Sequence, residues 1–179
     1  MTDEQLYKLK FPVGKFSVPE NYTPELLITW ISKIQNLPQR LKQELEGLTA
    51  QQLSASYRPE GWNIAQIVHH YADSHLNAYI RFKLALTEDT PTVKPYAEAL
   101  WAGLNDGKDL NISASLQIIE GVHARWTILL KTLSDTDFKK GFFHPEHKRI
   151  ITLNESLGMY AWHCDDHIAH IQLAKQNPY

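Results

Sequence analysis

The chain has 179 residues, of which 43% are hydrophobic and 21% charged, and its formal net charge is −2. This length and composition are typical of one globular domain with its own core, and they argue against intrinsic disorder. Runs of Lys or Arg never exceed two residues, so the charge pattern disfavours a nucleic-acid-binding surface. We therefore expect a single domain over residues 1–179 that does not bind nucleic acid.

A single cysteine excludes an intramolecular disulfide, which fits a reducing compartment. The first residues are polar and acidic, and apolar stretches fall well short of the ~20 residues that span a bilayer. These features predict a cytoplasmic protein without membrane association. Nine histidines are an unusual number, and six of them fall into two clusters.

Residues 1–22 carry Pro12, Gly14 and Pro19 among isolated apolar residues, which predicts an extended N-terminal arm. Thr23, Pro24 and Glu25 then have the residue types that begin a helix, and an apolar period continues to about residue 46. Pro38 lies inside this helix, so we expect a kink or break near residues 35–37.

Three more long helices are indicated by apolar residues at steps of three and four. They cover residues 63–87, 113–133 and 152–176, with a short helix near 96–104 and a hairpin formed by 140–144 and 149–152. The pattern predicts an all-α four-helix bundle with short extra helices and a small β-hairpin.

The last helix contains His163 and His167, and this spacing of four places two imidazoles on one face, about 5–6 Å apart at Cβ. Such a pair can chelate a divalent metal. A histidine-rich helix whose rings only pack or hydrate explains the same pattern equally well. His170 continues the stripe by one turn. A third ligand from another helix is needed to decide between a metal site and a helix whose histidines only pack.

The second cluster, on the helix over residues 63–87, offers three candidates for that ligand. His69 points away from the apolar face and is expected to be exposed, whereas His75 lies near the middle of that face and is expected to be buried. His70 lies at the edge of the face, as do His163 and His167 on the last helix. Two bundle helices can join such edge positions at the rim of the core, so the helix faces favour His70, His163 and His167.

Three neutral imidazoles with one open position are typical of a catalytic zinc site with a metal-bound water. We expect one divalent ion per subunit, with Zn²⁺ favoured and Ni²⁺ also compatible. Cys164 is expected to be a small buried residue or a pocket-lining thiol rather than a ligand. Asp73, Asp165 and Asp166 could each hold the second nitrogen of a ligand ring, although solvent exposure is the simpler interpretation for all three.

A stripe of uncharged polar residues and one arginine flanks the apolar face of the helix over residues 63–87. It consists of Gln66, Ser74, Asn77 and Arg81 beside His70. These side chains suit the wall of a wet cleft, and a merely solvated flank remains the alternative. His123 points inward from the third long helix, where a satisfied core histidine is the simplest interpretation. Together with the stripe it completes the set of substrate-pocket candidates.

Three long motifs stand out in the chain. The first runs from Arg58 to His75 and continues to Glu88, and two closing motifs cover 141–146 and 160–171. These motifs resemble the DinB-like superfamily and, within it, the YfiT-type branch. The resemblance implies a four-helix bundle, a divalent metal on His70, His163 and His167, and a homodimer. The chain differs from the family at Asp165 and Asp166, where further histidines are often found.

The resemblance also implies a metal-dependent hydrolase that acts on a small-molecule substrate. Two alternatives remain open, namely a metal-dependent thiol S-transferase that uses a low-molecular-weight thiol, and a non-enzymatic metal-binding dimer of a stress response. Peptide hydrolysis of the H-E-x-x-H type is disfavoured because Glu does not follow either ligand of the last helix. Met159, Trp162 and Leu173 lie off the main apolar face of this helix, which fits a homodimer, but the N-terminal arm could cover them equally well.

Overall fold

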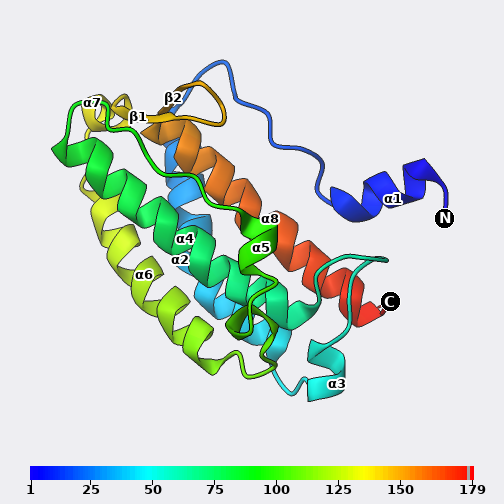
Figure 1. Ribbon diagram of the computed structural model, residues 1–179. Helices are drawn as coiled ribbons and strands as arrows, with labels where there is room; N and C mark the ends of the chain where they lie inside the picture. Colours follow the sequence, from blue (N-terminus) through cyan, green and yellow to red (C-terminus); the bar gives the residue numbers. More distant parts are fainter. Residues whose placement is uncertain (177) are drawn as a thin grey trace.

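The computed structural model describes residues 1–176 and 178–179, and four long helices form its centre (Figure 1). These helices are α2 (Pro24–Leu45), α4 (Ile64–Thr87), α6 (Ser113–Lys131) and α8 (Leu153–Gln176). The predicted four-helix bundle is therefore confirmed, with boundaries within one or two residues of the expected ones. Their buried faces share one core of Leu, Ile, Val and aromatic side chains.

The order of the helices around the bundle differs from a simple up-and-down arrangement. Helix α2 packs on α6 and α8, and α4 also packs on α6 and α8. Consecutive long helices α2 and α4 therefore occupy opposite corners, whereas consecutive helices are neighbours in an up-and-down bundle. One consequence is that α4 and α8, the two histidine-rich helices, lie side by side.

Capping residues begin α2 and α4 where the sequence predicted. At α4, Asn63 Oδ1 accepts the backbone N–H of Gln66 at 2.8 Å, and the Gln66 side chain accepts the N–H of Asn63 at 3.1 Å. At α2, Thr23 caps the helix and Pro24 takes its first position. These contacts satisfy backbone donors that the first turn of a helix leaves free.

We expected a kink or a break near residues 35–37. Helix α2 runs without interruption through Pro38, so the break does not occur, and the kink stays a prediction. An interior proline costs roughly 3 kcal/mol relative to alanine. Ile34, Leu37 and Leu41 surround it and are fully buried, and burial of each such side chain stabilises by about 1.5–3 kcal/mol. Core packing on both sides of the proline therefore outweighs its cost.

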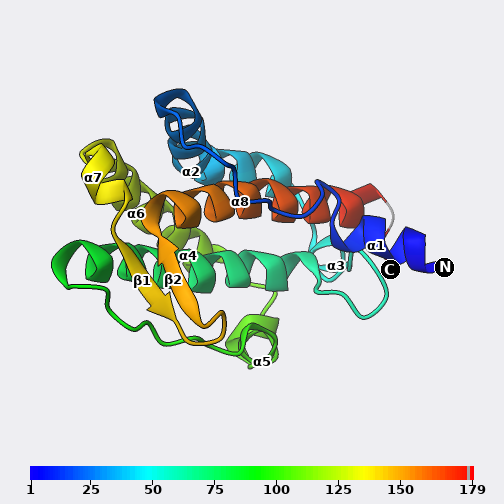
Figure 2. The same cartoon turned by 90° about the horizontal axis from the view of Figure 1, so that it is seen from above.

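Short elements fill the connections between the long helices. They are α3 (Ala50–Leu53), α5 (Glu98–Trp101), the 3-10 helix η1 (Asp106–Lys108) and α7 (Asp135–Phe138). Strands β1 (Gly141–His144) and β2 (Arg149–Thr152) form the predicted antiparallel hairpin, with Gly141 opposite Thr152. The hairpin packs on α4 and α8 and extends towards α5 (Figure 2).

The N-terminal arm is not wholly extended, because α1 (Asp3–Lys10) forms within it. Thr2 and Gln5 form a reciprocal capping box, and Lys8 pairs with Glu4 one turn earlier at 2.7 Å. These local contacts support a helix that the prolines and glycine further along the arm obscured. The rest of the arm follows α8 (Figure 2), where the indole N–H of Trp162 donates to the carbonyl of Gly14 at 2.8 Å.

Among the described helices, none is both long enough and apolar enough to cross a bilayer.

Candidate metal centre

Three histidines from two neighbouring helices converge at one edge of the bundle. His70 comes from α4, and His163 and His167 come from α8. Each can offer one ring nitrogen such that all three nitrogens lie within 4.8 Å of one another. The structure thus brings together the three residues that the helix faces and the family motifs singled out.

The spacing of these nitrogens fits a metal ion. Nε2 of His70 lies 3.1 Å from Nε2 of His163. Two imidazoles on a tetrahedral zinc, with Zn–N bonds of 2.0–2.1 Å, hold their nitrogens about 3.3 Å apart. The observed pair therefore needs only a small adjustment to share one cation. Histidine nitrogens in this arrangement are ligands that zinc and nickel both accept.

The environment keeps the three rings neutral, which metal binding requires. Burial lowers the pKa of His70 to about 4. Burial also lowers the pKa values of His163 and His167 well below the ordinary range, and the neighbouring histidines lower them further. At pH 7 a cation therefore meets three uncharged imidazoles and displaces few protons from them.

One hydrogen bond fastens the ligand-bearing segments of α4 and α8 to each other. The hydroxyl of Tyr71, next to His70, donates to the carbonyl of Cys164 at 2.7 Å. Cys164 lies between the two ligands of α8 and is fully buried. Burial raises the pKa of its thiol, so Cys164 is a packing residue, as its sequence context predicted.

An aromatic side chain lies against one side of the histidine group. The ring of Trp62, from the loop before α4, is centred 4.7 Å from that of His70 and 6.3 Å from that of His167. Trp62 is half-buried, so it presents an apolar wall to anything that approaches the site.

The second nitrogens of the two α8 ligands contact other histidines rather than the predicted acids. His163 Nδ1 lies 2.9 Å from Nε2 of His75, and His167 Nδ1 lies 3.1 Å from Nδ1 of His170. His170 in turn lies 3.7 Å from Asp166. Asp166, His167 and His170 form a second group with metal-binding geometry, but it shares His167 with the first.

The other two acids are half-buried, whereas solvent exposure was the simpler interpretation of both. Asp165 pairs with Lys33 at 2.6 Å and with Arg40 at 2.7 Å, and it thereby links α8 to α2. Asp73 is half-buried on α4, and burial raises its pKa. Asp165 thus stabilises the bundle and does not orient a ligand ring.

Two other histidines of α4 differ from what the sequence predicted. His69 lies in a different environment, and His75 has a contact that was not predicted. His69 is not exposed, because its ring contacts the Ser115 hydroxyl at 2.7 Å and the Asp109 carbonyl at 2.8 Å. The packing of η1 and α6 over α4 explains this difference. His75 is fully buried as predicted, but the contact with His163 was not foreseen, because a position on a helix face does not reveal its partner across the bundle.

The five predicted substrate-pocket residues separate in the structure. Gln66 caps α4 and donates to the Ala102 carbonyl at 2.9 Å, and Asn77 donates to the Asp73 carbonyl at 2.8 Å. Ser74 is buried. The polar groups of Gln66 and Asn77 are therefore engaged within the fold rather than offered to a ligand.

Arg81 and His123 differ from each other in their surroundings. Arg81 lines a pocket of about 130 Å³ together with Tyr96, His144 and Tyr160. His123 is fully buried and hydrogen-bonded at both nitrogens, so it belongs to the bundle interior rather than to a substrate pocket.

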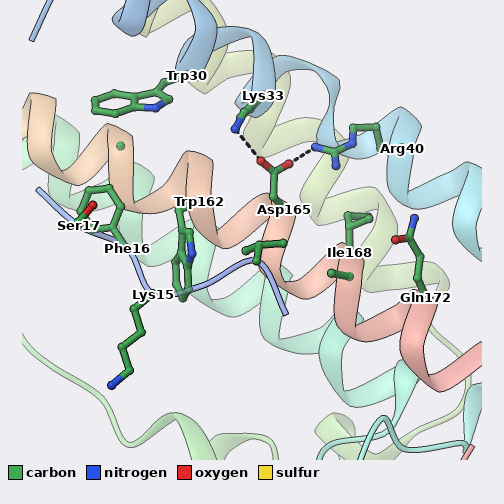
Figure 3. A pocket seen from close by; sticks show the side chains of 13 residues that line it. Lys15, Phe16, Ser17, Trp30, Lys33, Arg40, Trp162, Asp165, Ile168 and Gln172 are labelled. Atoms are coloured by element: carbon green, nitrogen blue, oxygen red, sulfur yellow. Dashed lines mark hydrogen bonds and ion pairs between the residues drawn. The ribbon is translucent and has the colours of Figure 1, made fainter. Parts of the chain in front are cut away.

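A larger pocket, of about 540 Å³, lies between α2, α8 and the N-terminal arm (Figure 3). The Asp165 carboxylate and its two cationic partners lie on one side, and Trp30 and Trp162 lie along the other parts of the lining. Asp165, Ile168 and Gln172 enter it from the face of α8 that meets α2. The candidate metal ligands point from the other face, towards α4.

The chain matches the model of the DinB superfamily over residues 33–171. It is 48% identical to the Bacillus subtilis protein named "Putative metal-dependent hydrolase YfiT" over 163 residues, which cover 91% of this chain and 92% of that protein. A relative from Oceanobacillus iheyensis, also named as a "Putative metal-dependent hydrolase", is 46% identical over 162 residues, or 90% of this chain and 93% of the other.

Solved structures show the same fold. The structure of YfiT from Bacillus subtilis, described as a probable metal-dependent hydrolase with an unusual four-helix bundle topology, aligns with a TM-score of 0.90 at 47% identity. This alignment covers 94% of this chain and 97% of that one. The mycothiol-dependent maleylpyruvate isomerase aligns with a TM-score of 0.64 at 19% identity over 81% of this chain and 60% of that one, a likeness of fold.

Proposed function

This chain belongs to the DinB superfamily, and we propose that it is a metal-dependent hydrolase that acts on a small molecule. In this proposal His70, His163 and His167 hold one divalent cation per chain. Zn²⁺ is the favoured ion, because three imidazoles with an open position suit it, and Ni²⁺ fits the same ligands. The names of the curated relatives support a metal-dependent hydrolytic activity.

The observation that carries the proposal is the convergence of three neutral imidazoles from two helices. Nε2 of His70 and Nε2 of His163 are 3.1 Å apart, and the ring of His167 is centred 4.4 Å from that of His163 and 5.0 Å from that of His70. His70 is buried and His163 and His167 are half-buried, and hydrophobic packing alone gives three such rings little reason to turn their nitrogens towards one another. A shared cation gives them one.

When bound, a divalent cation on three neutral imidazoles keeps its full charge and acidifies water at its open position. The protein's own residues prepare the site for this chemistry. Burial keeps the three rings uncharged at neutral pH. Trp62 screens one side of the histidines from solvent and offers an apolar surface to a substrate.

A substrate panel with matched variants tests the proposal. Metal-free protein without a His tag is reloaded with Zn²⁺ or Ni²⁺ and incubated with small esters, amides and lactones. We expect the wild-type protein to hydrolyse a substrate and a chelator to abolish this activity. His163→Ala should remain folded but lose the activity, and His69→Gln should retain it. His69 is a suitable control because it is a buried histidine of the same helix whose ring contacts Ser115 and Asp109.

The same panel separates the alternatives. Low-molecular-weight thiols with an electrophilic acceptor are included, and conjugate formation without hydrolysis identifies a thiol S-transferase. Metal binding without turnover of any substrate identifies a metal-binding protein without enzymatic activity. Either result contradicts the hydrolase proposal.

We also propose that the chain forms a homodimer, as the family resemblance implied. The sequence argument for it has weakened, because the N-terminal arm binds Trp162, and Met159 and Leu173 pack against the core. Light scattering coupled to size-exclusion chromatography decides between one copy and two.

A further inference from the structure

A chain of hydrogen bonds crosses the whole bundle and ends at a candidate metal ligand. The carbonyl of Ile34 on α2 contacts Nδ1 of His123 on α6 at 2.5 Å. Nε2 of His123 contacts Nδ1 of His75 on α4 at 2.8 Å, and Nε2 of His75 contacts Nδ1 of His163 on α8 at 2.9 Å. Each of the four long helices therefore contributes one group.

The carbonyl at the start of this chain determines the direction of every hydrogen bond in it. A carbonyl only accepts, so Nδ1 of His123 carries a hydrogen, and in the neutral ring Nε2 is then an acceptor. His75 must consequently donate from Nδ1 and accept at Nε2. His163 must donate from Nδ1, which leaves the lone pair of its Nε2 unprotonated. That nitrogen is the one that lies 3.1 Å from Nε2 of His70.

Pro38 explains why the carbonyl of Ile34 is available to His123. In an α-helix the N–H of residue 38 donates to the carbonyl of residue 34. Proline has no N–H, and α2 continues through Pro38. The proline therefore removes the backbone donor that competes with His123 for the Ile34 carbonyl. Ile34 and His123 are both fully buried, so water does not compete for this carbonyl either.

We propose that Pro38, the Ile34 carbonyl, His123 and His75 act as a positioning device for the metal centre. The device holds His163 as the tautomer with hydrogen on Nδ1, and it thereby keeps the Nε2 lone pair directed at the cation. This inference rests on the proposed metal site, which it deepens by assigning a role to residues that do not touch the ion. His75 and His123 are positioning residues, and Pro38 leaves the Ile34 carbonyl free to accept the hydrogen bond at the end of the series.

The interior location of the chain supports this role. His75 and His123 are fully buried, and an imidazole nitrogen in such a place needs a partner. All four nitrogens of the two rings have one. Burial lowers the pKa values of both residues, which favours the neutral rings that transmit a single direction. Partners of this kind typically change metal affinity by roughly 10–100-fold.

The tautomer of His163 can be measured directly on metal-free protein. Long-range ¹H–¹⁵N correlation spectra distinguish a protonated from an unprotonated ring nitrogen in each histidine. We expect hydrogen on Nδ1 and none on Nε2 for His163, His75 and His123. Hydrogen on Nε2 of His163 overturns the proposal. Because no metal is present, this readout stands apart from the proposed hydrolase activity.

Variants of His123 test the consequence for metal binding. His123→Phe keeps an aromatic ring but removes both contacts, and we expect Zn²⁺ affinity to fall by roughly 10–100-fold. His123→Gln retains an oxygen that can accept from His75, so it should recover part of that loss. The control His69→Phe removes a buried histidine that takes no part in this series of hydrogen bonds, and it should leave Zn²⁺ affinity within about twofold of wild type. Equal affinities in His123→Phe and wild type contradict the proposal.

Pro38→Ala separates positioning from general stability. Alanine restores the backbone donor to the Ile34 carbonyl and favours the helix, so the urea midpoint of unfolding should stay the same or rise. Zn²⁺ affinity should nevertheless fall, by about tenfold, at the lower end of the range for such partners. An unchanged affinity removes Pro38 from the device. If wild-type protein binds no Zn²⁺ at all, the proposed function fails. The tautomer of His163 still shows whether the hydrogen bonds from Ile34 to His163 run in the inferred direction.

Discussion

The Tyr71 hydroxyl on α4 donates a hydrogen bond to the Cys164 carbonyl on α8 at 2.7 Å. Both residues lie next to candidate metal ligands. Tyr71 directly follows His70, and Cys164 directly follows His163. This fully buried contact, together with the contact between His75 and His163, helps to fix the separation of the helices where the three imidazoles meet.

Removal of this hydroxyl should loosen both the bundle and the site. We expect Tyr71→Phe to lower the free energy of unfolding by about 1 kcal/mol, the usual net value of a buried neutral hydrogen bond. Urea unfolding of metal-free protein measures it. Tyr79→Phe is the matched control, because the Tyr79 hydroxyl only accepts a long hydrogen bond of 3.4 Å from the Lys83 amine within the described part of the chain. Equal losses in the two variants contradict the assigned role of Tyr71.

Two glycines inside long helices should respond to alanine in opposite directions. A Cβ at Gly158 of α8 would lie 2.6 Å from the ring of Trp30 on α2, whereas a Cβ at Gly121 of α6 meets nothing within 4 Å. We expect Gly158→Ala to destabilise by about 1–3 kcal/mol through overpacking. Gly121→Ala should stabilise by up to about 1 kcal/mol through helix propensity. Thermal unfolding of both variants checks the signs, and a stable Gly158→Ala protein means that α2 and α8 are less closely packed.

The buried histidines should make the metal-free protein sensitive to acid. Burial lowers the pKa of His123 to about 4, although its hydrogen bond to the Ile34 carbonyl opposes this change. In the unfolded chain a histidine titrates near 6.5. Between these values the unfolded chain binds a proton that the folded protein does not bind.

The free energy of unfolding should therefore fall as pH decreases from about 6.5 to about 4. Each such histidine contributes a slope of up to about 1.4 kcal/mol per pH unit. Urea unfolding at pH 7, 6 and 5 measures the slope, which should be shallower in His123→Phe because one of these groups is absent. Identical slopes in the two proteins contradict a neutral, buried His123.

Much of the fold could be predicted from the sequence because its long helices carry strong local signals. Asn63 and Thr23 cap helices in the structure as their sequence context indicated. The break expected at Pro38 did not occur, because the packing of Leu37 and Leu41 is a tertiary effect that a local rule omits. Helix α1 was missed because the prolines and glycine beyond it dominated the interpretation of the arm.

The histidine triad could be predicted because helical spacing places His163 and His167 together and the edge of the apolar face singles out His70. The partners of the ligands could not be predicted in the same way. Asp165 seemed a candidate by its place in the motif, yet Lys33 and Arg40 bind it from α2. The contact of His75 with His163 depends on which helices are neighbours, and this order is set by diagonal connections that local patterns do not reveal.

A signal for the chain of hydrogen bonds was nevertheless present in the sequence. His123 lies on an apolar face, and a proline stands four residues after Ile34 in the interior of a helix. A buried histidine needs an acceptor, and an interior proline leaves one carbonyl without its usual donor. The buried histidine and the free carbonyl become hydrogen-bond partners because the bundle places α2 beside α6.

The most direct test of the account is a Zn²⁺ titration of metal-free, untagged protein by calorimetry. We predict one ion per chain for wild type and for His69→Gln, and loss of binding in His70→Ala, His163→Ala and His167→Ala with circular dichroism unchanged. A wild-type chain that binds no divalent ion, or a His163→Ala protein that binds Zn²⁺ as tightly as wild type, contradicts the proposed centre.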